Sequence, residues 1–136
     1  MLKYMLIIGL ILASFACSKE NTVAPDANIV KTTIDLQMGF ANQSVRLYVD
    51  SIKLFQALLS SAYPLAGPEA SIVTYLRQSL HRIVVARVTL DSISTLYLDT
   101  LQLNLTSSND CFVGLVAVAD SVIIKVQDHP FIYLCK

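Results

Sequence analysis

Apolar and polar residues alternate with a period of two along most of the chain after residue 28. Leu101, Leu103 and Leu105, for example, are separated by polar residues. This alternation is typical of strands with one buried face. Strand-like segments recur about every ten residues, which is the spacing of a β-sandwich or barrel. The pattern therefore predicts an all-β domain over residues 29–136, a small antiparallel β-sandwich.

Two segments, RIVVARVTL (82–90) and CFVGLVAV (111–118), are richer in β-branched residues and are predicted to be buried on both faces. Residues 68–80 allow two interpretations. In a short helix, Pro68 would occupy the first turn and Ile72 and Leu76 would share a stripe. In a strand, SIVTYL would turn at Gln78 into the next segment. The β-branched and aromatic residues in its middle favour the strand.

The N-terminal run from Met5 to Phe15 is apolar or small throughout and stops at the charged pair Lys19 and Glu20. A helix that spans a bilayer needs about 20 such residues, and this run is shorter. A short charged region, an apolar core and small terminal residues are typical of a secretory signal.

The stretch Ser14-Phe15-Ala16-Cys17 resembles the lipobox of bacterial lipoproteins. The resemblance implies a signal peptide over residues 1–16, lipidation of Cys17 and attachment to a membrane by the lipids. Residues 17–28 are polar and are predicted to form a flexible tether. Ser18 after the cysteine implies the outer membrane, facing either the periplasm or the cell surface. The alternatives are an ordinary signal with a chance cysteine, or an N-terminal membrane anchor.

A second, distant resemblance concerns the domain itself. VRLYVDSIKLF and SLHRIVVARV are similar to segments of small immunoglobulin-like and PEGA-like bacterial β-sandwiches. Those families have Gly where this chain has Ser51 and Leu80. The resemblance implies the same fold class and transfers no functional residue.

The charges of the chain balance, with ten basic and ten acidic residues. Removal of Lys3 with the signal leaves one more acidic than basic residue. A nucleic-acid partner would require a basic face, which this balance does not indicate, so no nucleic-acid partner is expected.

Cys17 apart, the chain has two cysteines, Cys111 and Cys135. Thiols beyond the inner membrane tend to oxidise, so we expect a disulfide between them; two buried free thiols are the alternative. His81 and His129 have no partners at ligand spacing, and no metal or other cofactor is expected.

No nucleophile elbow, metalloprotease motif or phosphate-binding glycine loop is present, so the prediction is a protein that is not an enzyme. His81 is expected at a strand start, as a surface or hairpin residue, and His129 in a turn. Five tyrosines of the domain are interpreted as packing residues, with a sugar-stacking row as the alternative. They are Tyr48, Tyr63, Tyr75, Tyr97 and Tyr133.

A short repeat of Asp, a hydroxyl residue and an aliphatic residue occurs four times, beginning at Asp50, Asp91, Asp99 and Asp120. Asp and Ser favour turns because their side chains bond neighbouring backbone groups. The repeat also resembles the O-glycosylation motif of exported proteins in one group of Gram-negative bacteria. The candidate acceptors are Ser51, Ser92, Thr100 and Ser121.

Two function classes follow. The first is a lipid-anchored structural or interaction module with an envelope protein as partner, and the second is a module that binds glycans or other ligands. A bare apolar patch would favour the protein partner, and an exposed row of tyrosines would favour the sugar.

Overall fold

The computed structural model describes residues 28–59, 67–89 and 96–133. This part of the chain is all-β, as predicted, and holds eight strands. They are β1 (Ile29–Met38), β2 (Gln43–Val49), β3 (Ile52–Leu58), β4 (Ala70–Arg77), β5 (Leu80–Thr89), β6 (Leu96–Asn104), β7 (Cys111–Val118) and β8 (Ser121–Gln127).

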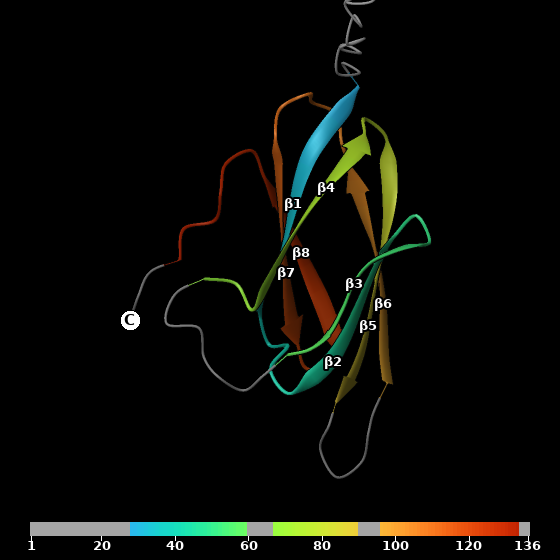
Figure 1. Cartoon of the computed structure of the whole chain (residues 1–136), viewed down its shortest axis with the longest axis vertical. Coiled ribbons are helices and arrows are strands. Elements are labelled where there is room, and N and C mark those ends of the chain that lie inside the picture. Colours follow the sequence, from blue (N-terminus) through green and yellow to red (C-terminus); the bar gives the residue numbers. More distant parts are fainter. Residues whose placement is uncertain (1–27, 60–66, 90–95, 134–136) are drawn as a thin grey trace, which may run out of the picture.

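The strands form two four-stranded sheets, with the orders β4-β1-β7-β8 and β3-β2-β5-β6. Figure 1 shows them as two layers, with β1 beginning at the top and β5 ending at the bottom. Side chains on the inner faces meet to form the core. Its fully buried members include Ile34, Leu47, Ile83, Val85 and Val113. Alternating apolar positions on each strand supply this inner layer.

One pairing differs from the predicted antiparallel sandwich. β1 and β7 are parallel, with Ile34 opposite Val113, whereas all the other strand pairs are antiparallel. Parallel neighbours require a long connection. Here the whole β3-β2-β5-β6 sheet lies in sequence between these two strands. Period-two alternation carries no information about the direction of a neighbour, so the sequence did not indicate this pair.

Residues 68–80 contain the strand β4 and no helix, which confirms the favoured interpretation. β4 pairs with β1, and Ile72 and Leu76 pack against the core from its inner side. Ser71, Val73 and Tyr75 alternate with them on the outer side. Ile72 and Leu76 would share a stripe on a helix. They also share one face of the strand, because they are an even number of positions apart.

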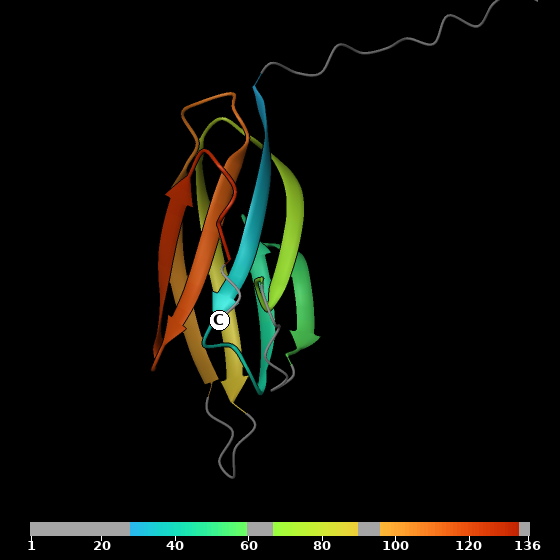
Figure 2. The same ribbon diagram turned by 90° about the vertical axis from the view of Figure 1, so that its left-hand side faces the viewer.

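The described end of the chain, residues 128–133, runs back across the outer face of β1 and β7, as Figure 2 shows. The Tyr133 hydroxyl donates to Asp35 Oδ2 at 2.7 Å. A Cβ placed on Gly114 would lie 2.8 Å from Phe131 Cζ, so glycine leaves room for this ring. β7 is therefore buried on both sides, as predicted for CFVGLVAV.

β5 does not meet the corresponding prediction for RIVVARVTL. Its inward residues Ile83, Val85 and Arg87 are fully buried, but Val84 and Ala86 on the opposite side are only half-buried. In the described part of the chain nothing covers this outer side, and composition alone had suggested burial on both.

The repeated Asp–hydroxyl–aliphatic segments do not all form turns. Asp50 and Ser51 form the β2–β3 turn, with φ of 49° and 71°, and Asp120 lies in the β7–β8 turn. Asp99 instead lies in the middle of β6, which corrects the turn prediction there. Its Oδ1 accepts from Val122 N, and its Oδ2 lies 3.6 Å from the Nη2 of buried Arg87. This inward ionic contact explains an acidic residue in mid-strand.

Candidate functional site

The most polar cluster of the inner layer joins His81 to two turns. His81 Nδ1 lies 2.6 Å from Asp50 Oδ2, in the β2–β3 turn. Its Nε2 lies 2.7 Å from the Arg77 carbonyl oxygen and 3.2 Å from Ser79 Oγ, next to the β4–β5 turn. His81 is only 6% exposed, so the expectation of a surface residue was wrong. The residue types are those of a Ser-His-Asp triad.

Hydrogen bonding determines what this histidine can do. A carboxylate oxygen and a carbonyl oxygen are both acceptors, so both ring nitrogens of His81 must donate. Burial alone would lower the pKa of His81, but the bonds to the Arg77 carbonyl and the Asp50 carboxylate outweigh it and raise the pKa. Because Nε2 carries a proton for the Arg77 carbonyl, it is not free to accept one from Ser79. His81 is therefore a charged residue that joins the β2–β3 hairpin to the β4–β5 turn between the two sheets, rather than a general base, and we call its contact with Asp50 the His81–Asp50 pin.

The lower pKa of Asp50 agrees with this interpretation. The backbone N–H of Arg82 donates to Asp50 Oδ1 at 2.9 Å, and this bond and the bond from His81 hold the pKa of Asp50 below its usual value. Asp50 N in turn donates to the Arg82 carbonyl. The β2–β3 turn is thus fixed to the start of β5 by backbone and side-chain bonds together.

The predicted modification sites are spread over the surface. Cys17 and Ser92 lie outside the described residues. Ser51, Thr100 and Ser121 are all exposed, in the β2–β3 turn, on β6 and at the start of β8. They do not come together into one site. His129 is also exposed, and its Nδ1 lies 2.8 Å from Asp128.

The expected disulfide receives no support from the structure. Cys111 is a free, buried thiol whose side chain belongs to the inner layer, and burial raises its pKa. Cys135 lies outside the described residues. Residues 128–133 cross the outer face of the sheet, whereas Cys111 points to the inner face. At Tyr133, whose hydroxyl contacts Asp35 on the outer face, the described chain lies on the other side of the sheet from this thiol.

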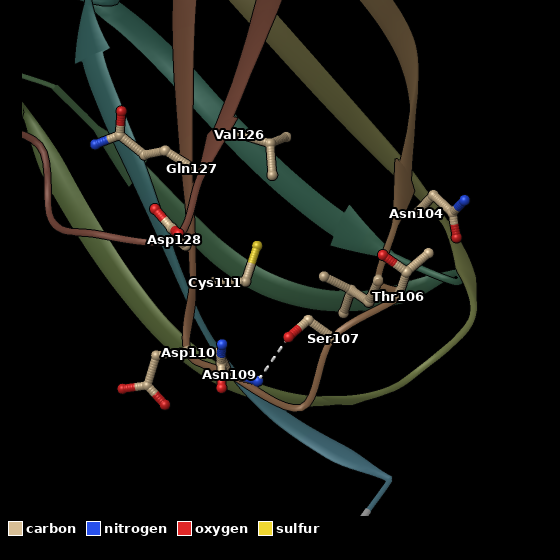
Figure 3. A pocket seen from close by; sticks show the side chains of 10 residues that line it. Asn104, Thr106, Ser107, Asn109, Asp110, Cys111, Val126, Gln127 and Asp128 are labelled. Carbon is tan, nitrogen blue, oxygen red and sulfur yellow. Dashed lines mark hydrogen bonds between the residues drawn. The ribbon is translucent and has the colours of Figure 1, made fainter.

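Cys111 also lines a pocket of about 300 Å³ at the end of the sandwich where β1 begins. Figure 3 shows its side chain pointing toward Val126, with Ser107 and Asn109 on the neighbouring loop. Asp110 and Asp128 are the charged residues of the lining. Within the described ranges no three histidine, cysteine or acidic side chains gather as metal ligands would. The pocket is at the small end of the range for ligand sites.

No other described segment covers the outer side of the β3-β2-β5-β6 sheet, which we call the outer β2–β5 face. Strand register places its apolar residues in adjoining rows across the sheet. Leu58, Leu96 and Leu98 are 62%, 66% and 67% exposed. Half-buried apolar side chains of β5 and Tyr48 of β2 continue the outer side next to Leu96 and Leu98, so these residues form one apolar patch. Its members are Tyr48, Val84, Ala86, Val88, Leu96 and Leu98, and Ser44 separates Leu58 from them.

The charges on the outer β2–β5 face have one sign. Arg46 lies in the row with Ala86 and Leu98, and Lys53 and Arg82 lie toward the end where β5 begins. None of the described side chains that point outward from these four strands is acidic, because Asp99 points inward. The face is therefore an apolar patch bordered by cationic side chains.

The tyrosines do not form a row on this face. Tyr48 lies on it, Tyr75 is exposed on the opposite sheet, and Tyr97 faces inward, 5.0 Å from Arg87. Tyr133 contacts Asp35 through its hydroxyl, and Tyr63 lies outside the described residues. The described tyrosines thus favour the interpretation as packing residues over a sugar-stacking row.

Comparisons with known proteins give no relative: no family model, no curated protein and no solved structure matches the chain. In the described part, no helix is long and apolar enough to cross a membrane. The site residues therefore have to be judged by their geometry. Sequence reasoning missed the apolar patch. The signal for it was the run Leu96-Tyr97-Leu98, in which apolar residues fall on both sides of a strand.

Proposed function

We propose that this chain is a lipid-anchored cell-envelope protein that acts by contact and binds another envelope protein through the outer β2–β5 face. The uncovered apolar patch carries this proposal. Large exposed apolar patches on soluble domains mark interaction surfaces, because leaving them in water is unfavourable. Leu96 and Leu98 stand side by side on β6, each about two-thirds exposed.

Charge indicates the chemistry of the partner. Arg46, Lys53 and Arg82 border the patch, and the carboxylate of Asp50, which accepts from Arg82 N at the end of the face where β5 begins, is paired with His81. A partner surface with an apolar centre and an acidic rim complements this arrangement, and opposite rim charges speed association and exclude wrong partners.

The position of the patch supports attachment at the other end. Val88 and Leu96 lie where β5 ends and β6 begins, opposite the end at which Ile29 starts the domain. A lipid on Cys17 and a tether of eleven further residues, with a reach of roughly 35 Å, would hold the Ile29 end near the membrane. The patch would then point away from the lipid surface, toward a partner.

The absence of catalysis belongs to the same proposal. The one Ser-His-Asp cluster among the described residues has both nitrogens of His81 committed to acceptors. A triad needs a ring nitrogen that accepts the serine proton. The cluster is therefore better suited to hold two turns together than to activate Ser79.

Site-specific photocrosslinking in the native cell tests the proposal. A photoreactive residue at Leu98 should crosslink one protein partner, and the same residue at Ile123 should not. Ile123 is a matched control, because it is half exposed on the outer face of the other sheet. Arg46→Glu should abolish the crosslink at Leu98, since an acidic rim would then be repelled.

Binding should then be measured with the purified partner. We expect Leu98→Lys to weaken its affinity at least about tenfold, because a central apolar contact becomes a buried charge. Equal crosslinking at both positions, or crosslinking unaffected by Arg46→Glu, would contradict the proposal. A crosslinked product that contains glycan and no second protein would support the sugar-binding alternative instead.

A further inference from the structure

The edge of β4 has a row of backbone groups that pair with no other described strand. β4 pairs only with β1, and its other side is an edge of the sheet. Gln78 N donates to Asn28 O at 2.7 Å, in register with the β1–β4 pairs. In an antiparallel pair, hydrogen-bonded positions alternate, so even-numbered residues of β4 bond to β1. The N–H and C=O groups of Ser71, Val73 and Tyr75 therefore point outward from this edge.

The other three edge strands carry features that hinder pairing. β3 has a bulge opposite Leu47 and Tyr48 and also carries Lys53. β6 carries the inward carboxylate of Asp99, and β8 carries Lys125. Bulges, lysines and inward charges are the common means of protecting an edge from adding another strand.

β4 has none of these features between Ser71 and Leu76. The pairing with β1 is regular along the whole strand, and the sequence SIVTYL is uncharged. Its outward side chains Val73 and Tyr75 are 54% and 67% exposed. A regular, apolar edge of this length is a template for another strand.

We infer that β4 pairs antiparallel with β4 of a second copy of this chain, with Val73 opposite Val73 on the two-fold axis. In this register Ser71 lies opposite Tyr75 of the second copy. The unpaired backbone N–H and C=O groups of one β4 edge therefore face those of the other along both strands. The three pairs would exchange about six backbone hydrogen bonds. A self-complementary contact of this kind closes as a dimer and leaves no further β4 edge.

The charges agree with this register. Arg77 of one copy falls opposite Glu69 of the other, so the two charged residues at the ends of the paired segments have opposite signs; Oε2 of Glu69 also accepts from Phe40 N of its own copy. A register centred on Thr74 would place Arg77 opposite Ser71 and lose this complementarity. The dimer does not depend on the outer β2–β5 face, which belongs to the other sheet, so its test is separate from that of the proposed function.

Sedimentation of the full chain in mild detergent tests the dimer. The wild type should be dimeric at micromolar concentration. Val73→Lys and Val73→Pro should each weaken dimerisation at least tenfold. The proline removes an N–H that points away from β1, so the fold should keep its circular dichroism spectrum. Ile123→Lys, an equal change on another edge strand, should leave the dimer intact.

Disulfide trapping tests the register. Thiols introduced by Val73→Cys meet at the axis and should join the two copies on oxidation. Thiols introduced by Tyr75→Cys are four residues apart along the paired strands, about 13 Å, and should not join. A monomeric wild type at 100 µM or more, a dimer unaffected by Val73→Pro, or equal trapping at both positions would overturn the inference. Trapping of a different protein at position 73 would also overturn it.

Discussion

His81 shows how a single buried side chain links stability to pH. Its positive charge is compensated by Asp50, 31 residues away in sequence and 2.6 Å away in space. The pKa of His81 is raised and that of Asp50 is lowered. A group whose pKa is higher in the folded than in the unfolded chain stabilises the fold fully at pH values below its unfolded pKa, which is about 6.5 for histidine. This stabilisation is lost as the pH rises through the pKa of the folded state. For Asp50 the stabilisation is present above about pH 4 and is lost on further acidification.

We therefore predict that the wild type is more resistant to urea at pH 6 than at pH 9, and that Asp50→Asn reduces this difference. The amide still accepts from Arg82 N but no longer stabilises the charged ring. The urea midpoint at both pH values measures the effect. Asp128→Asn is the control, because Asp128 and His129 are exposed neighbours in sequence and can interact in the unfolded chain too. An unchanged pH difference in Asp50→Asn would contradict the assignment of a charged His81.

At the scale of elements, the C-terminal segment completes the β4-β1-β7-β8 sheet. Phe131 lies over Gly114, and Tyr133 shields Asp35, which also accepts from Ser71 Oγ at 2.6 Å. Burial, followed by the nearby Asp35 carboxylate, raises the pKa of Tyr133, so its hydroxyl remains a donor. The segment thereby covers an outer face that would otherwise expose a carboxylate beside apolar residues.

We predict that Gly114→Ala destabilises the domain by about 1–3 kcal/mol, because the added methyl group collides with Phe131 and the Gln37 side chain. The cost should be smaller in a Phe131→Ala background, where the ring is absent. Urea unfolding of the four variants forms a double-mutant cycle. Gly39→Ala is the control: its methyl group would meet the Ala117 backbone at a φ of +86°, so removal of Phe131 should not relieve it. Additive costs at Gly114 and Phe131 would contradict this packing.

At the scale of the whole molecule, the two ends of the sandwich differ. The end where β1 begins holds the His81–Asp50 pin and the pocket lined by Cys111, and the most exposed part of the apolar patch, at Leu96 and Leu98, lies toward the opposite end. Such a difference between the two ends is expected of an anchored module in which one end stays near the membrane and the other meets a partner.

The anchor is tested by metabolic labelling with a fatty acid. We predict that the wild type is labelled and that Cys17→Ala is not, because Cys17 is the proposed lipid attachment site. Cys111→Ala should retain the label, since Cys111 is buried in the domain. Equal labelling of the wild type and Cys17→Ala would remove the basis for a lipid anchor and for the outer-membrane localisation.

The sequence by itself determined the fold class, favoured a strand over a helix within residues 68–80, and indicated the turn at Asp50–Ser51 and the inward positions of Leu47 and Leu103. These features are local, because a period of two indicates which side chains share one face of a strand. Periodicity does not indicate which of the two faces another element will cover. Only the tertiary structure decided the parallel β1–β7 pair, the exposure of Leu98 and the free edge of β4. The same holds for the contacts of His81 with Asp50 and of Tyr133 with Asp35, because these partners lie 31 and 98 residues apart and meet only when the sheets have formed.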